Sequence, residues 1–116
     1  MEVTREIHFV VGFLVGLCAL FFSWNSRGRR VMNVLLGIQV LIGLALAGSF
    51  GMSHVPLPPG IWGHVAFGLA GLVAYAFARR IGDRPGGGRA GLALSLIGLL
   101  CVAATLYVGW HAAGTP

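Results

Sequence analysis

The chain has 116 residues, of which 57% are hydrophobic and only 9% are charged, and its mean hydropathy is +0.87. Soluble domains carry a charge on about a quarter of their residues. This composition therefore excludes a soluble enzyme, a disordered tail and a secreted disulfide scaffold. It predicts a protein that folds inside a lipid bilayer.

Four uncharged stretches predict four membrane-spanning helices, at residues 7–24, 31–51, 60–78 and 90–110. Each is close to the roughly 20 residues with which a helix crosses a hydrocarbon core about 30 Å thick. The connections at residues 25–30, 52–59 and 79–89 are short, so consecutive helices should be antiparallel neighbours. We therefore expect an all-α, up-down-up-down, integral membrane four-helix bundle in which residues 1–116 form a single domain.

The arginines predict the orientation of the bundle. Seven of the eight lie in the first and third connections, where Asp83 is the only acidic residue, whereas the opposite end carries Glu2, Arg5 and Glu6. By the positive-inside rule, the arginine-rich connections face the cytoplasm. Both termini then lie on the extracytoplasmic side of the cell's inner (cytoplasmic) membrane. Such short connections provide no folded basic face, so nucleic acid is not expected as a partner.

Small residues predict close packing of the helices. Gly12 and Gly16 form one pair at a spacing of four residues, and Gly91 and Ser95 form another. In lipid, helices associate through such close backbone contacts and through polar side chains. Gln39 is the one strongly polar side chain deep in an apolar stretch. We expect it to form a hydrogen bond to another helix, in preference to binding a quinone or transferring a proton.

The four histidines are the most informative residues. His8 opens the first predicted helix, His54 follows the second, His64 lies in the first turn of the third, and His111 closes the fourth. In an up-down-up-down bundle all four fall at the extracytoplasmic end. The separation of His8 from His54 is nearly that of His64 from His111, which suggests two pseudo-symmetric helical hairpins related by an axis along the membrane normal.

Imidazoles at one depth in a bundle predict a haem or metal site. Haem iron takes two axial nitrogens from facing helices, whereas four imidazoles can hold a copper or zinc ion directly. Gly12 and Gly68 follow His8 and His64 by four residues, so both lie on the same helical faces as these histidines and leave room for a porphyrin.

His8 and His64 are therefore the first-choice ligands. His54 and His111 come next, as a second pair holding a second haem or as hydrogen-bonding neighbours. The same four side chains also suit plain interfacial positions without any cofactor. No C-x-x-C-H motif is present, which excludes covalent c-type haem.

With His8, His54, His64 and His111 near helix ends, the chain resembles the small membrane-embedded b-type cytochromes of respiratory chains. The resemblance implies haem b and electron exchange with quinol or with an extracytoplasmic redox partner. It implies an electron-transfer or anchor subunit rather than a stand-alone enzyme. The cytoplasmic half has no histidine, so redox chemistry should be confined to the outer leaflet.

Two other classes of function stay open. One is a metal-handling or assembly membrane protein that uses the same histidines. The other is a cofactor-free structural subunit that packs against other membrane subunits or against further copies of the chain.

Overall fold

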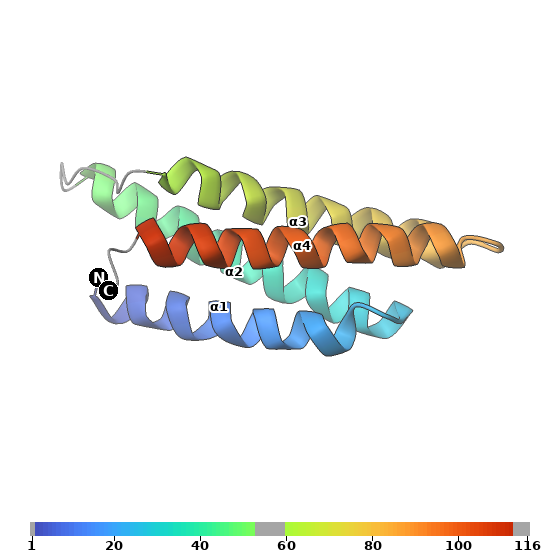
Figure 1. Cartoon of the computed structure of the whole chain (residues 1–116). Coiled ribbons are helices and arrows are strands. Elements are labelled where there is room, and N and C mark those ends of the chain that lie inside the picture. Colours follow the sequence, from blue (N-terminus) through green and yellow to red (C-terminus); the bar gives the residue numbers. More distant parts are fainter. Residues whose placement is uncertain (1, 53–59, 113–116) are drawn as a thin grey trace.

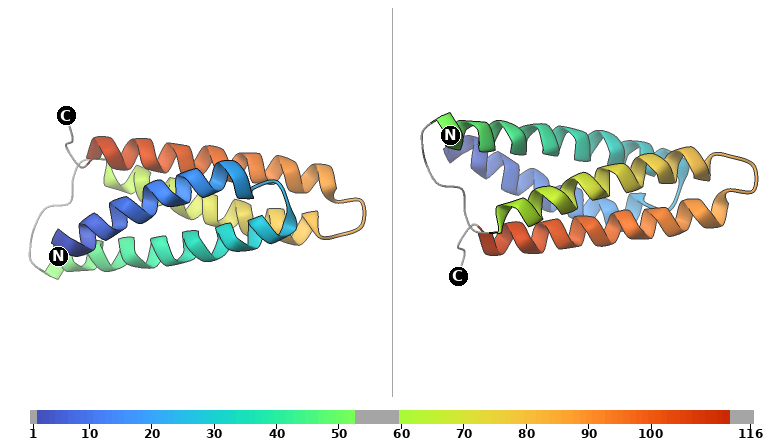
Figure 2. Two further views of the ribbon diagram at one scale, coloured as in Figure 1. Left: turned by 90° about the horizontal axis from the view of Figure 1, so that it is seen from below. Right: turned by 90° about the horizontal axis from the view of Figure 1, so that it is seen from above.

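The computed structural model describes residues 2–52 and 60–112, which form the helices α1 (Glu2–Phe22), α2 (Ser26–Met52), α3 (Ile61–Gly82) and α4 (Gly88–Ala112). The helices lie side by side and alternate in direction (Figure 1). α3 and α4 share the largest interface, α2 packs on α1 and α3, and α1 has a smaller contact with α4. The predicted all-α, up-down four-helix bundle is confirmed, and Figure 2 shows it from two further sides.

All four helices are long and apolar enough to cross a membrane. Large apolar side chains cover the outside of the bundle: Phe21 is 72% exposed, Leu41 68% and Leu100 61%. An apolar surface of this extent is stable only when lipid or another apolar partner covers it. The chain is therefore a multi-pass membrane protein.

Most helix ends lie beyond the apolar stretches, whereas α1 ends at Phe22, two residues before its predicted end, so the connections differ from the predicted ones. α2 already begins at Ser26, because the side chain of Asn25 accepts a hydrogen bond from the backbone N–H of Gly28 at 2.7 Å and caps the helix. α3 continues through Arg79 and Arg80 to Gly82. Arginine is a good helix former, and its long stem lets the charge reach the headgroup region from a helical position.

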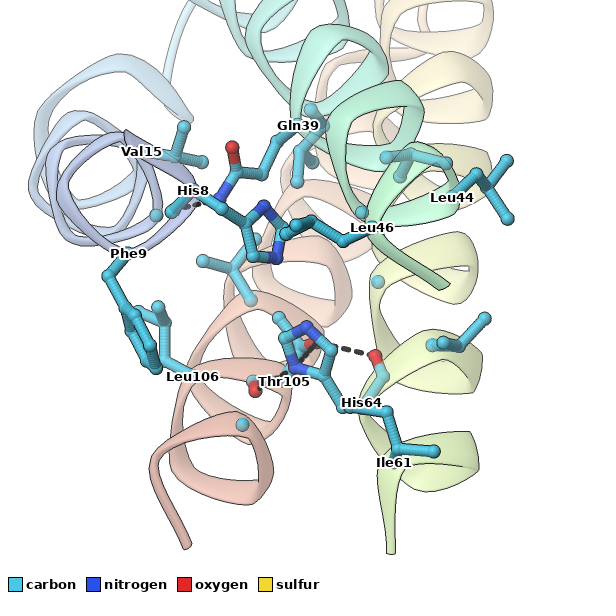
Figure 3. Close-up of a pocket in the computed structure, with 18 of the residues that line it drawn as sticks. His8, Phe9, Val15, Gln39, Leu44, Leu46, Ile61, His64, Thr105 and Leu106 are labelled. Carbon is cyan, nitrogen blue, oxygen red and sulfur yellow. Dashed lines mark hydrogen bonds between the residues drawn. The ribbon is translucent and has the colours of Figure 1, made fainter. Parts of the chain in front are cut away.

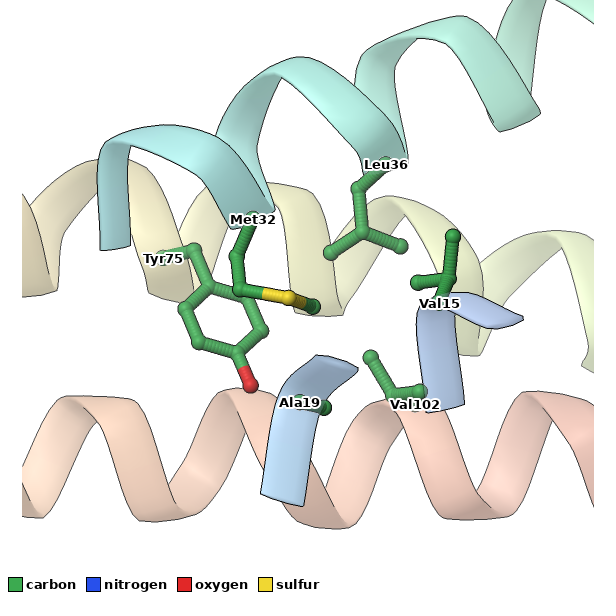
Figure 4. Close-up of a cluster of buried hydrophobic side chains, with 6 residues drawn as sticks. All are labelled: Val15, Ala19, Met32, Leu36, Tyr75 and Val102. Carbon is green, nitrogen blue, oxygen red and sulfur yellow. The ribbon is translucent and has the colours of Figure 1, made fainter. Parts of the chain in front are cut away.

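All four helices contribute to a small apolar core in the middle of the bundle. Its buried members are Val15 and Ala19 of α1, Met32 and Leu36 of α2, Tyr75 of α3 and Val102 of α4 (Figure 4). The ring of Tyr75 lies against Gly98 of α4, where an added Cβ would come within 2.9 Å of the ring. The absence of a side chain at residue 98 is therefore what admits the tyrosine.

A buried polar network continues from this core toward the end of the bundle that carries the arginines, here called the arginine end. Ser23 donates to the carbonyl of Ala19 at 2.5 Å, so the Tyr75 hydroxyl, 2.6 Å away, must be the donor to Ser23. Arg29 is only 5% exposed, and its Nε donates to the Ser95 hydroxyl at 2.8 Å. Nε of Arg29 also donates to the carbonyl of Ser23 at 3.4 Å, so the network joins all four helices. Arg29 therefore stabilises the bundle in addition to its predicted effect on topology.

Candidate functional site

A pocket opens among all four helices at the opposite end of the bundle, here called the histidine end. Its volume is about 240 Å³, and most of its lining is apolar. Besides Arg5, the lining includes four polar side chains and four glycines, namely His8, Gly12, Gln39, Gly43, His64, Gly68, Thr105 and Gly109. We call this site the histidine pocket.

The pocket brings His8 of α1 and His64 of α3 together. Their ring centres are 5.9 Å apart and their planes are nearly perpendicular, at 86°. In Figure 3 the two rings point toward one another, with one ring nitrogen of each on the facing side. One metal held 2.0–2.1 Å from each of two opposed imidazole nitrogens places the ring centres roughly 6 Å apart. The separation of the two first-choice ligands is close to this value.

The proton of His64 has a defined position. Nδ1 of His64 lies 2.7 Å from the carbonyl oxygen of Thr105, and because a carbonyl only accepts hydrogen bonds, Nδ1 must be the donor. The Thr105 hydroxyl lies 3.0 Å from the same nitrogen and itself donates to the carbonyl of His64 at 2.5 Å. A neutral His64 therefore carries its lone pair on Nε2, as a metal-ligating histidine requires.

His8 is held by Gln39 of α2. The side-chain amide of Gln39 donates through Nε2 to the backbone carbonyl of His8 at 2.6 Å, so the predicted hydrogen bond to another helix is confirmed. Nδ1 of His8 and Oε1 of Gln39 are both buried, and neither has a hydrogen-bond partner within the described residues. Figure 3 shows the amide beside the ring.

Glycines make room for these four polar side chains. An added Cβ at Gly109 would lie 2.6 Å from Nδ1 of His64, and one at Gly43 would lie 3.3 Å from Cε1 of His8. The two glycines named from the sequence also line the pocket. A Cβ at Gly12 would lie 3.0 Å from Nε2 of Gln39, and one at Gly68 would lie 3.6 Å from Oγ1 of Thr105.

Three residues of the pocket were not predicted from the sequence, namely Gly43, Gly109 and Thr105. The available signal was their spacing, because Gly43 follows Gln39 by four residues and Gly109 follows Thr105 by four.

The other two histidines do not join the pair in the part of the chain that the structure describes. His111 is exposed, and its ring packs on Tyr107 with the ring centres 4.5 Å apart. His54 lies outside the described residues. Within residues 2–52 and 60–112, no group of three or more His, Cys, Asp or Glu side chains could hold a metal ion. The described site is thus a pair of imidazoles.

Aromatic and aliphatic side chains line the seam between α1 and α4. Phe9 and Phe13 come from α1, and Leu106 and Trp110 from α4. The rings of Phe13 and Trp110 meet edge to face with centres 5.9 Å apart. The α1–α4 interface is smaller than the other interfaces between neighbouring helices. The pocket wall can therefore open along this seam with the smallest loss of helix–helix contact.

Comparisons of the chain with protein-family models, with curated proteins and with solved structures found no significant match. The geometry of the pocket is therefore the basis for assigning a function.

Proposed function

We propose that this chain is a membrane-embedded b-type haem protein, an electron carrier or redox anchor subunit, with His8 and His64 as the axial ligands. The observation that carries the proposal is the hydrogen bond from Nδ1 of His64 to the Thr105 carbonyl, 2.7 Å long. It leaves Nε2 of His64 as the acceptor nitrogen beside the ring of His8. This nitrogen, together with a second imidazole that faces it, makes up the donor set of bis-histidine haem.

The lining of the pocket fits a porphyrin in its chemistry. The wall is mostly apolar, and Gly12, Gly43, Gly68 and Gly109 let the two histidines and their partners Gln39 and Thr105 pack close to the neighbouring helices. The volume of about 240 Å³ is below the roughly 300–1,000 Å³ of typical ligand pockets. A macrocycle therefore needs additional room, which the thinly packed seam between α1 and α4 can supply by opening to lipid.

Haem b would supply a one-electron iron centre, and the residues of the chain would tune it. Thr105 holds the His64 ring in one orientation and one tautomer, which raises the basicity of the ligating nitrogen. The apolar wall formed by Phe9, Phe13 and Leu106 excludes water, and burial of this kind is one of the terms that set a reduction potential.

We further propose that the arginine end faces the cytoplasm, which puts the histidine pocket near the extracytoplasmic face. The support is the charge asymmetry between the two ends. Electrons would then be exchanged at that face, with quinol arriving through the lipid or with a docked redox partner. A transmembrane route would need a further subunit or a second copy.

Titration of the detergent-purified full chain with haem tests the proposal. We expect one haem per chain, a Soret band, and sharp visible bands on reduction. His64→Ala should lose tight binding, whereas His111→Ala, the matched control, should keep it because His111 lies away from the pocket. A wild-type protein that shows no Soret band after unbound haem has been removed would overturn the proposal. Binding of copper or zinc by the same protein would then support the metal-handling alternative.

A further inference from the structure

We propose that Gln39 is the positioning residue of His8: its Oε1 accepts the Nδ1 proton of His8, as the carbonyl and hydroxyl oxygens of Thr105 accept that of His64. This inference deepens the proposed function, because it assigns the partner of the second axial ligand in the same pocket. It rests on a repeat within the bundle and on two unsatisfied buried atoms.

The repeat relates the hairpin of α1 and α2 to the hairpin of α3 and α4. In each hairpin the first helix carries a histidine and the second helix carries a polar side chain, and each of these residues is followed four positions later by glycine. The four pairs are His8 with Gly12, Gln39 with Gly43, His64 with Gly68, and Thr105 with Gly109. Gln39 therefore occupies in the first hairpin the position that Thr105 occupies in the second.

The glycines pack reciprocally in both hairpins. Gly43 of α2 faces the His8 ring, with 3.3 Å between its added Cβ and Cε1, and Gly12 of α1 faces the Gln39 amide, with 3.0 Å to Nε2. In the second hairpin, Gly109 faces the His64 ring and Gly68 faces Thr105 in the same way. The agreement extends from spacing to contacts, so the two pairs of polar residues are structural counterparts.

The counterpart pairs differ in one respect. In the second hairpin, the donor Nδ1 of His64 and the acceptors of Thr105 are joined, at 2.7 and 3.0 Å. In the first, Nδ1 of His8 and Oε1 of Gln39 are both buried and unsatisfied, although the other end of the same amide already bonds to the His8 carbonyl at 2.6 Å. A single hydrogen bond from Nδ1 of His8 to Oε1 of Gln39 would satisfy both atoms.

The consequence concerns the tautomer of His8. With Oε1 of Gln39 as its acceptor, a neutral His8 holds its proton on Nδ1 and leaves a lone pair on Nε2. Both imidazoles then offer the same nitrogen to the pocket. The two axial ligands would be equivalent in protonation and each would be oriented by the second helix of its own hairpin.

Asn33 provides a matched control. It also lies on α2, it also donates across the bundle, from Nδ2 to the carbonyl of Leu72 at 3.2 Å, and its Oδ1 is also buried without a partner among the described residues. It does not line the histidine pocket. Asn33→Leu and Gln39→Leu therefore remove comparable amides, and only the second removes one beside His8.

The test uses the haem-free full chain in detergent micelles, with histidine labelled by ¹⁵N and the His8 signals assigned by their loss in His8→Ala. We expect the wild-type NMR spectrum to show His8 and His64 as the Nδ1–H tautomer. Gln39→Leu should move His8 toward the Nε2–H tautomer that a free histidine side chain prefers and leave His64 unchanged. Asn33→Leu should change neither. An Nε2–H tautomer of His8 in the wild type, or no change in Gln39→Leu, would overturn the inference.

This readout needs no haem, so it separates the inference from the proposed function. If the wild type binds haem, Gln39→Leu should also weaken binding by about 10–100-fold, the usual effect of removing a partner that orients a ligand. Gln39→Glu, which keeps an acceptor, should retain the Nδ1–H tautomer. A Gln39→Glu protein with the tautomer of Gln39→Leu would count against the proposed hydrogen bond.

Discussion

Nδ1 of His64 and the backbone carbonyl of Thr105 are joined across α3 and α4 by a hydrogen bond of 2.7 Å. The acceptor is part of the main chain of a helix, so its position is fixed by the packing of α3 on α4 rather than by a side-chain rotamer. This interface is the most extensive in the bundle. His64 is therefore the more rigidly oriented of the two facing imidazoles.

Substitution of a pocket glycine by alanine should disturb haem binding more strongly the closer the added Cβ lies to a histidine ring. Gly109→Ala puts a Cβ 2.6 Å from Nδ1 of His64, too close for the ring to stay in place, whereas Gly43→Ala puts one 3.3 Å from the His8 ring. We expect Gly109→Ala to lose haem and Gly43→Ala to bind it more weakly than the wild type, measured by titration of the Soret absorbance.

Gly37→Ala and Gly48→Ala are the controls for this series. An added Cβ at either position meets nothing within 4 Å. Both variants should bind haem like the wild type. Equal losses across all four variants would mean that general helix packing, and not the space around the rings, controls binding.

Ser23→Ala should destabilise the bundle more than Tyr75→Phe. Tyr75 is the donor to Ser23, so removal of Ser23 leaves a buried hydroxyl proton without an acceptor, which costs about 1–3 kcal/mol. Tyr75→Phe removes the donor and leaves only an acceptor lone pair unfilled, which costs about 0.5–1.5 kcal/mol. Unfolding of the two variants in mixed micelles measures the difference, and the reverse order would show that the hydrogen bond runs the other way.

Arg29→Met should lower the stability of the bundle, whereas Arg30→Met should not. The two residues are neighbours in the first turns of α2, but Arg29 is buried and bonded to Ser95 while Arg30 is exposed. Loss of a hydrogen bond to a charged donor costs about 1.5–3 kcal/mol. Thermal unfolding in detergent compares the pair, and equal stability of the two variants would contradict a structural role for Arg29.

Much of the fold follows from the sequence, because length and apolarity alone determine that four helices cross a membrane. The bounds of the helices do not follow, since the charge of Arg79 or Arg30 ends an apolar stretch without ending a helix. The convergence of His8 and His64 was predictable from topology. The hydrogen bond from His64 to the Thr105 carbonyl was not predictable, because any residue type carries a carbonyl, although the spacing of Thr105 and Gly109 marked the position. The burial of Arg29 likewise depends on Ser95, which lies far along the chain.

Under the proposed function and orientation, electron transfer by the single chain should be confined to the extracytoplasmic face. The site lies at the histidine end, and the described residues at the arginine end include no histidine. In sealed vesicles with the arginine end inside and a reductant trapped there, an impermeant external acceptor should be reduced no faster than in protein-free vesicles. Cysteine labelling of the turn at residues 83–87 from the cytoplasmic side establishes the orientation. Rapid reduction without added quinone would contradict the confinement.

The proposed ligation of one iron by both His8 and His64 can be tested by the spin state of the ferric haem protein. The wild type should be low-spin and six-coordinate in its optical and electron paramagnetic resonance spectra. His64→Gly, prepared with haem in excess, should be high-spin, and added imidazole should restore the low-spin spectrum by filling the space that the side chain leaves. A His64→Gly protein that stays low-spin without imidazole would show that another residue is the ligand.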